Sequence, residues 1–176
     1  MGKLLFFDRN KTEQNLERLT AGELFKLAVA ERNPFWSERL YLKAVEKDPN
    51  PGFEASCTIN RGTLQFELGN YQKAAELYQL AVELNPNCIE GWYNLGNVLD
   101  DLGQSVEAVE SYYKGLELDN SCANIHFNLA IVLTQLGKEE VAELHWKQYL
   151  TYGTDKKGRI VAQDHLKVTY LQIIKK

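Results

Sequence analysis

Asparagine is the residue whose spacing first suggests chemistry in this chain. Asn60, Asn94 and Asn128 follow one another at intervals of 34 residues. An asparagine side chain offers two N–H donors and one carbonyl acceptor, which match the groups of a peptide bond. A row of such side chains could hold the backbone of an extended peptide with little demand on its sequence. The alternative is that these amides bond neighbouring helices and serve only the fold.

Residue types that catalyse reactions or bind metals lack a supporting arrangement. Asp100 and Asp101 are adjacent, so on a helix their carboxylates point about 100° apart and make a poor acid–base pair. Cys57, Cys88 and Cys122 form no CxxC motif, and the three histidines are scattered without HxxxH spacing. Phosphate-binding, nucleophile-elbow and zinc-protease motifs are also absent. We therefore predict no catalytic residue, no metal, no cofactor and no enzymatic activity.

The residues around each asparagine belong to an internal repeat of 34 residues. Each unit has two apolar stretches of helical period, which a glycine separates and a turn closes. Such a hairpin cannot bury its own apolar face, so successive hairpins must stack. We expect the small residues to face the alanines across each hairpin and the aromatic residues to fill the seam between units. The repeated positions are Gly69, Gly103 and Gly137; Ala74, Ala108 and Ala142; Tyr78, Tyr112 and Trp146; and Gly62, Gly96 and Ala130.

This pattern resembles the tetratricopeptide repeat, or TPR, most clearly in Trp92-x2-Leu95-Gly96 and Ala108-x3-Tyr112. The resemblance implies an all-α protein, a right-handed α-solenoid of stacked helix-turn-helix hairpins. The closing repeat also resembles that of many bacterial TPR proteins, which suggests a bacterial origin. We predict an N-terminal cap segment with a short helix at 1–19, a degenerate repeat at 20–52, repeats at 53–87, 88–121 and 122–154, and a C-terminal capping helix at 155–176.

The first unit departs from the pattern, yet it carries helix-start signals. Thr20 and Glu23 form a capping-box pattern, and Asn33 precedes a proline that can open the second helix. In the next unit Arg61 stands where the two later units have leucine. We expect an acid of the first unit, such as Glu46, to pair with it.

The N-terminal stretch Lys3–Phe7 is apolar, and a helix-start signal follows it at Asn10. We expect this segment to cap the first unit. The alternative is that it occupies a groove of its own or a neighbouring copy, which would give dimers. The expected oligomeric state is therefore a monomer or a weak homodimer.

The resemblance places the first helix of each unit on the concave surface, where it would form a peptide-binding groove. Ile59, Tyr93 and Phe127 precede the repeated asparagines and should form an apolar stripe beside them. The basic clamp that some TPR proteins use for acidic chaperone tails is missing, so we expect a neutral to basic peptide or helix as ligand. The predicted groove residues are Asn60, Tyr93, Asn94, Asn97, Asp101, Asn124, Phe127 and Asn128.

Composition adds limits on the partner and the location. The 176 residues are 44% hydrophobic and 25% charged with a net charge of −4, which is ordinary for a globular protein. Nothing in this balance favours nucleic acid or an anionic membrane surface. No stretch approaches the ~18 apolar residues of a membrane helix, and the apolar start is shorter than the ~7–15 residues of a signal peptide. We therefore expect a cytoplasmic protein.

These observations favour a non-enzymatic adaptor or scaffold that binds a segment of a partner protein in its groove. Two alternatives come from the resemblance to small acidic TPR proteins. One is a dedicated chaperone for an exported protein, as in type III secretion. The other is a regulatory subunit of an enzyme or a transcription factor.

Overall fold

The structure is a computed structural model that describes residues 15–174. Within that range the chain forms helices and no strands. The all-α class predicted from the repeat pattern is therefore confirmed. The bounds of the helices are α2 Ala21–Ala30, α3 Pro34–Lys47, α4 Pro51–Glu67, α5 Tyr71–Leu84, α6 Ile89–Asp101, α7 Ser105–Leu118, α8 Ala123–Gln135, α9 Glu139–Tyr152 and α10 Lys156–Ile174.

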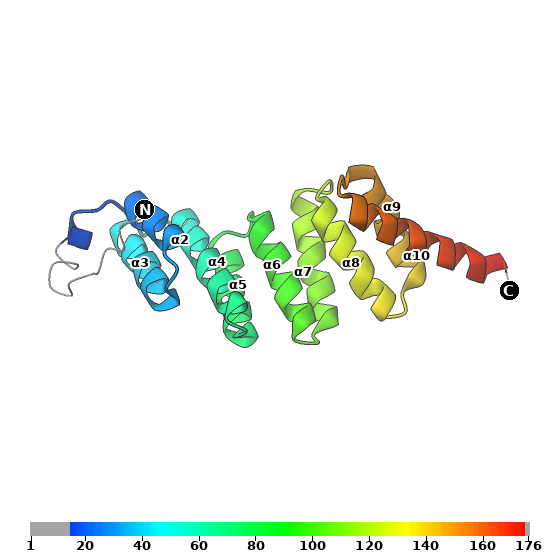
Figure 1. The fold of residues 1–176 in the computed structure, drawn as a ribbon, viewed down its shortest axis with the longest axis horizontal. Helices are drawn as coiled ribbons and strands as arrows, with labels where there is room; N and C mark the ends of the chain where they lie inside the picture. Colours follow the sequence, from blue (N-terminus) through cyan, green and yellow to red (C-terminus); the bar gives the residue numbers. More distant parts are fainter. Residues whose placement is uncertain (1–14, 175–176) are drawn as a thin grey trace, which may run out of the picture.

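The helices pair into antiparallel hairpins that lie side by side in one row (Figure 1). The pairs are α2 with α3, α4 with α5, α6 with α7, and α8 with α9, and α10 packs on α9. Helices α2 and α10 lie at opposite ends of the row. Contacts run mainly between neighbours in the row, which is the arrangement of a helical solenoid.

Polar side chains start the helices of the first hairpin as the sequence predicts. The Thr20 hydroxyl accepts a hydrogen bond from the Glu23 backbone N–H, and the Glu23 carboxylate accepts one from the Thr20 backbone N–H. The Asn33 side chain accepts bonds from the N–H groups of Phe35 and Trp36. These contacts satisfy N–H groups that lack a partner within the helix. The capping box and the asparagine cap are therefore confirmed.

Glycine is required at the turn between the helices of each repeated hairpin. Gly69, Gly103 and Gly137 have φ angles of 77°, 75° and 70°, in the left-handed region. Other residues pay a steric cost there because of their Cβ atom. The predicted role of these glycines at helix ends is confirmed, and it explains why they recur at a fixed spacing.

The small residues Gly62 and Gly96 of the repeated helix position lie against tyrosine rings. A Cβ atom added to Gly62 would lie 2.7 Å from the Tyr78 ring, and one added to Gly96 would lie 2.5 Å from the Tyr112 ring. Both rings lie in the same hairpin as the glycine that they cover. Each tyrosine packs on the glycine of its own hairpin, and its ring also belongs to a buried cluster that includes residues of the next unit, as expected for the seam.

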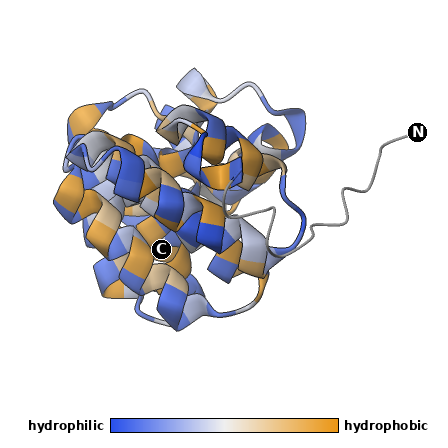
Figure 2. Cartoon of the chain, turned by 90° about the vertical axis from the view of Figure 1, so that its left-hand side faces the viewer, coloured by the Kyte–Doolittle hydropathy of each residue, from blue (hydrophilic) through white to orange (hydrophobic). Residues whose placement is uncertain are grey.

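Apolar and polar residues alternate along the helices (Figure 2). The buried residues form three clusters, of which the largest joins α7, α8, α9 and α10. Ile59 is 3% exposed and belongs to the core, so the predicted apolar stripe loses one of its three members. It packs in the cluster that contains Ala74, Tyr78 and Val82 of α5.

Arg61 pairs with a different acid from the expected Glu46. Its guanidinium lies 3.3 Å from a carboxylate oxygen of Glu38, which also lies 3.5 Å from the Lys73 ammonium group. Glu38 is on the part of α3 that faces α4, whereas Glu46 is exposed near the end of that helix. The partner is an acid of the first unit, as expected, but it is Glu38 and not Glu46.

Candidate peptide-binding groove

Two hollows lie over the first helices of the last two repeats and meet at Asn128. We call them together the inner groove. The smaller hollow has a volume of about 280 Å³ and the larger one about 440 Å³. The smaller is lined by Phe66, Asn97, Asp100, Asp101, Tyr112, Asn128 and Ile131, and the larger by Tyr93, Asn124, Phe127, Asn128, Tyr149, Asp155, Lys157, Gly158 and Val161.

Most of the predicted groove residues line these hollows, and two do not. Asn60 and Asn94 border neither of them. The Asn60 amide donates a hydrogen bond to the Ser56 carbonyl oxygen one turn back on its own helix, at 2.8 Å. The structure therefore brings together the predicted residues Tyr93, Asn97, Asp101, Asn124, Phe127 and Asn128.

The asparagines of the inner groove form a hydrogen-bonded network between α6 and α8. The Asn128 amide donates to the Asn97 carbonyl oxygen at 2.7 Å and approaches the Tyr93 hydroxyl at 3.5 Å. The Tyr112 hydroxyl donates to the same Asn97 oxygen at 2.8 Å. Asn128 therefore bonds an asparagine one turn beyond Asn94, and part of its hydrogen-bonding capacity holds the two helices together.

Carboxylates give one end of the inner groove an acidic character. Burial, with the nearby Asp100 charge, raises the pKa of Asp101. Asp100 accepts a hydrogen bond from the Ser105 hydroxyl at 3.1 Å. At the other end Asp155, directly before α10, and Lys157 of α10 lie at the border. Sequence reasoning missed these two residues because nothing in the repeat pattern shows that α10 folds back beside the groove.

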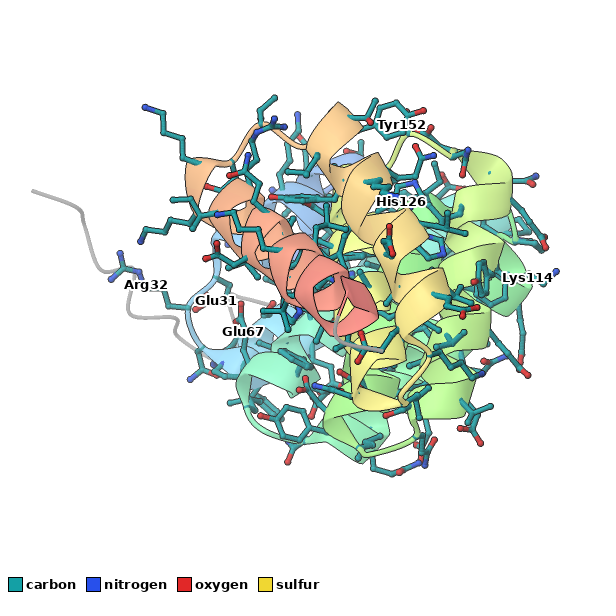
Figure 3. The ribbon with its side chains drawn as sticks, turned by 90° about the vertical axis from the view of Figure 1, so that its right-hand side faces the viewer. Glu31, Arg32, Glu67, Lys114, His126 and Tyr152 are labelled. Atoms are coloured by element: carbon teal, nitrogen blue, oxygen red, sulfur yellow. The ribbon has the colours of Figure 1, made fainter. Side chains whose placement is uncertain are left out.

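A histidine pair lies away from the inner groove, at the junction of α7, α8 and α9. His126 and His145 approach each other with their Nδ1 atoms 2.9 Å apart. The His126 ring is 1% exposed and stacks on Tyr152, with ring centres 6.1 Å apart (Figure 3). The sequence analysis treated the histidines as scattered. His126 and His145 occupy the repeat positions of Trp92 and Ser111 one unit earlier. Those two residues line the same hollow, so aligning the repeats gives a signal that the histidines lie close together.

The partners of the pair fix its tautomers. The Asn120 carbonyl oxygen can only accept, so His126 Nε2 carries the proton and donates to it at 2.9 Å. The bare His126 Nδ1 then accepts from His145 Nδ1–H, and His145 Nε2 accepts from the Tyr113 hydroxyl at 3.3 Å. Burial, with the His126 ring beside it, lowers the pKa of His145 to about 4. His145 is thus neutral near pH 7.

The described residues contain little that could support catalysis or bind a metal. No group of three or more His, Cys, Asp or Glu side chains is placed to hold a metal ion in that range. Burial raises the pKa of the Cys57 thiol to about 11, so this cysteine is a weak nucleophile near neutral pH. Among the same residues no helix has the length and apolar character needed to cross a membrane.

Two family models match the middle of the chain. A model described as TPR repeat covers residues 62–103, and one described as Tetratricopeptide repeat covers residues 89–122. This is a tetratricopeptide repeat protein. The matched residues span α5, α6 and α7, where the repeat pattern in the sequence is clearest. In this TPR protein the remaining hairpins follow the same geometry with weaker sequence signals.

Solved structures agree with the TPR fold. The chain is similar to a structure titled MamA, with 21% identity, a TM-score of 0.69, and coverage of 81% of this chain and 83% of that one. It is also similar to a tetratricopeptide repeat protein from Parabacteroides merdae ATCC 43184, with 20% identity, a TM-score of 0.73, and coverage of 84% and 59%. No curated protein sequence matches this TPR protein. At these identities the likeness concerns the fold alone.

Proposed function

We propose that this TPR protein is an adaptor that binds an extended or helical segment of a partner protein in its inner groove. TPR repeats are in general protein–protein interaction modules without catalytic activity, so a protein partner is the expected ligand. The observation that carries the proposal is the meeting of two hollows at Asn128. Together their linings supply aromatic rings, amides and carboxylates on the two sides of this residue.

The chemistry of this surface supports a neutral to basic ligand. Tyr93 and Phe127 are half-buried and supply flat apolar contacts, while Asn97 and Asn128 offer amide groups beside them. Aromatic anchors with polar neighbours are common at recognition surfaces. The carboxylates at one end of the groove would repel a ligand carboxylate and attract a lysine or arginine.

A pull-down from the source cells tests the proposal. The groove variant is Asp101→Ala/Asn124→Ala, because both side chains are exposed and neither is among those that hold α6 to α8. The control is Glu140→Ala/Gln148→Ala, which makes the same change of charge on exposed positions of α9. A partner that the wild type and the control retain and the groove variant loses supports binding in the inner groove. Equal recovery by all three would refute it.

The alternatives from the sequence lead to different behaviour of the captured partner. A dedicated chaperone would suppress aggregation of one unfolded client, which light scattering can follow. A regulatory subunit would change the activity of its partner, whereas an adaptor forms a stable complex between folded proteins. The segment 3–7, which could link two copies, lies outside the described residues. Sedimentation of the full chain would therefore be needed to measure the oligomeric state.

A further inference from the structure

Helix α6 presents a second set of residues on the side away from the inner groove. Successive helix positions are rotated by about 100°, so Trp92, Leu95 and Leu99 lie roughly opposite Tyr93 and Asn97. These three residues line a hollow between α5 and α7. We call the spaces between consecutive second helices the outer grooves. The first lies between α3 and α5, the middle one between α5 and α7, and the third between α7 and α9.

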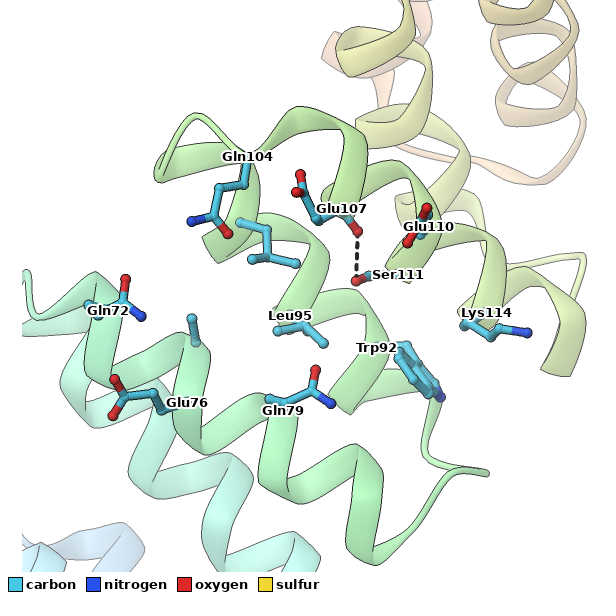
Figure 4. Close-up of a pocket in the computed structure, with 12 residues that line it drawn as sticks. Gln72, Glu76, Gln79, Trp92, Leu95, Gln104, Glu107, Glu110, Ser111 and Lys114 are labelled. Carbon is cyan, nitrogen blue, oxygen red and sulfur yellow. Dashed lines mark hydrogen bonds between the residues drawn. The ribbon is translucent and has the colours of Figure 1, made fainter.

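The middle outer groove is open and has an apolar floor. Its volume is about 530 Å³. Leu95 and Ala75 form the floor at 3% and 7% exposure, and the half-buried Trp92 closes one end (Figure 4). The Trp92 indole N–H donates to the Pro86 carbonyl oxygen at 2.8 Å. The ring is therefore held in place before any ligand arrives, which reduces the entropy lost on binding.

The edges of the middle outer groove are acidic. Glu76 lies on the α5 side, and Glu107 and Glu110 lie on the α7 side (Figure 4). No ion pair joins any of these three carboxylates to another residue in the described range. The lysine at this edge, Lys114, already pairs with Glu117 at 2.9 Å. The edge therefore carries an excess of negative charge around an apolar floor.

The first outer groove is closed by the protein's own charged residues. Glu38 of α3 contacts Arg61 of α4 at 3.3 Å and Lys73 of α5 at 3.5 Å. It also accepts a hydrogen bond from the Gln65 amide at 3.4 Å. Arg61 occupies the repeat position of Leu95, so an ion pair stands where the middle groove has an apolar floor.

The third outer groove is closed by the histidine pair. Tyr113 of α7 bonds His145 of α9 across the groove, and His145 bonds His126 of α8 beneath it. These three residues occupy the repeat positions of Gln79, Ser111 and Trp92. In the middle groove the polar residues Gln79 and Ser111 do not bond each other. The Gln79 amide donates to Glu83 at 2.8 Å, and the Ser111 hydroxyl donates to the Glu107 carbonyl oxygen at 3.0 Å.

We propose that the middle outer groove is a second protein-binding site, which takes the apolar face of a basic amphipathic helix. The apolar floor receives leucine-sized side chains, and the flanking lysines or arginines of the ligand pair with the edge carboxylates. A cation beside the Trp92 ring gains a further attraction from its π electrons. This site and the inner groove lie on opposite sides of α6, so the protein can hold two segments at once.

The test uses a fluorescent amphipathic helix of leucine and lysine as the probe, with 14 residues to match the length of α5 and α7. A scrambled peptide of the same composition, which has no apolar face, is the reference probe. Fluorescence anisotropy gives the affinity of both peptides for the full chain and its variants. The edge variant Glu107→Lys/Glu110→Lys reverses the charge of the groove. The control Glu46→Lys/Glu140→Lys reverses the same charge at exposed positions outside it.

A second variant closes the groove with residues that this protein already uses. Gln79→Tyr/Trp92→His/Ser111→His copies the constellation of the third outer groove and leaves the edge carboxylates in place. Thermal melts show which variants are folded. If the closing variant does not fold, the edge variant still decides the result, because both of its side chains are exposed.

The proposal predicts that the wild type binds the amphipathic probe at least about tenfold more tightly than the scrambled one. The edge and closing variants should lose about tenfold in affinity, and the control should stay within about twofold of wild type. Equal losses in the control and the edge variant would mean general charge attraction and would overturn the proposal. So would equal affinity for both peptides. A loss caused by Asp101→Ala/Asn124→Ala would place the probe in the inner groove instead.

Discussion

At the residue scale, two glycines decide how closely the helices of a hairpin approach. Gly62 and Gly96 accept the rings of Tyr78 and Tyr112, which are 3% and 1% exposed. A buried phenol needs a partner for its hydroxyl group. The Tyr78 hydroxyl bonds Thr63 at 3.1 Å, and the Tyr112 hydroxyl bonds an asparagine of the inner groove. The glycine therefore supports the groove indirectly, through the ring that it accommodates.

We predict that Gly96→Ala lowers the free energy of unfolding by about 1–3 kcal/mol, the usual cost of overpacking a core. The added methyl group would lie 2.5 Å from the rigid Tyr112 ring, so the ring must move. Urea denaturation measures the change. Gly22→Ala is the matched control, because an added Cβ there meets nothing within 4 Å. That change should be neutral or stabilising by up to ~1 kcal/mol. If Gly96→Ala had the same free energy of unfolding as the wild type, the Tyr112 ring would not be tightly held.

At the element scale, His145 takes part in the contacts that link α7, α8 and α9, and burial holds it there in the neutral form. Protonating His145 would add a hydrogen at Nε2, which could then no longer accept from the Tyr113 hydroxyl of α7, and it would place a positive charge in a buried site. The pKa of His145 is about 4 in the folded protein, below the ordinary value of 6.5. Between these two values the unfolded chain binds the additional proton. His145 therefore contributes its full stability above about pH 6.5, and this contribution is lost as the pH falls toward 4.

We predict that His145→Gln flattens this dependence. In the wild type the residue should reduce the free energy of unfolding by at most about 1.4 kcal/mol per pH unit over that window. Denaturation of both proteins between about pH 7.5 and about pH 4.5 gives the difference in slope. Gln148→Ala, an exposed change on the same helix, should keep the wild-type slope. Identical slopes for the wild type and His145→Gln would contradict the assigned role.

At the scale of the whole molecule, the protein is a row of units that contact mainly their neighbours. Helix α10 covers the last unit and buries Ala162 completely against the cluster that contains Trp146 and Tyr149. In such an array the stability of one unit reaches distant units only through the interfaces between them. A substitution that destabilises the last unit should therefore affect the neighbouring unit before it affects distant ones.

Ala162→Asp tests this expectation by placing an unpaired carboxylate in that cluster, at a local cost on the order of several kcal/mol. We expect the backbone amides of α9 and α10 to lose protection from hydrogen exchange. The amides of α4 and α5 should stay close to wild type. The exposed substitution Gln163→Asp on the same helix is the control and should change neither region. Uniform loss of protection across the chain would show that the array unfolds as one cooperative unit.

The sequence alone predicted the hairpins because their signals are local. Glycines with positive φ, capping side chains and apolar residues at helical spacing act within one or two turns, so Gly103 and Thr20 could be interpreted without a structure. The repeat aligned Asn94 with Asn128 on stacked units, and in the structure Asn128 bonds Asn97, one turn further along the helix that carries Asn94.

Tertiary structure decided what the repeat does not encode. The structure was needed to find the partner of Arg61, the burial of Ile59 and the approach of Lys157 to the inner groove. All three depend on how separate helices pack, and the repeat pattern does not contain that information. The open middle outer groove is the clearest case. The second helix of each hairpin has an outer groove beside it. Whether that groove is closed depends on side chains that reach across it from two different units.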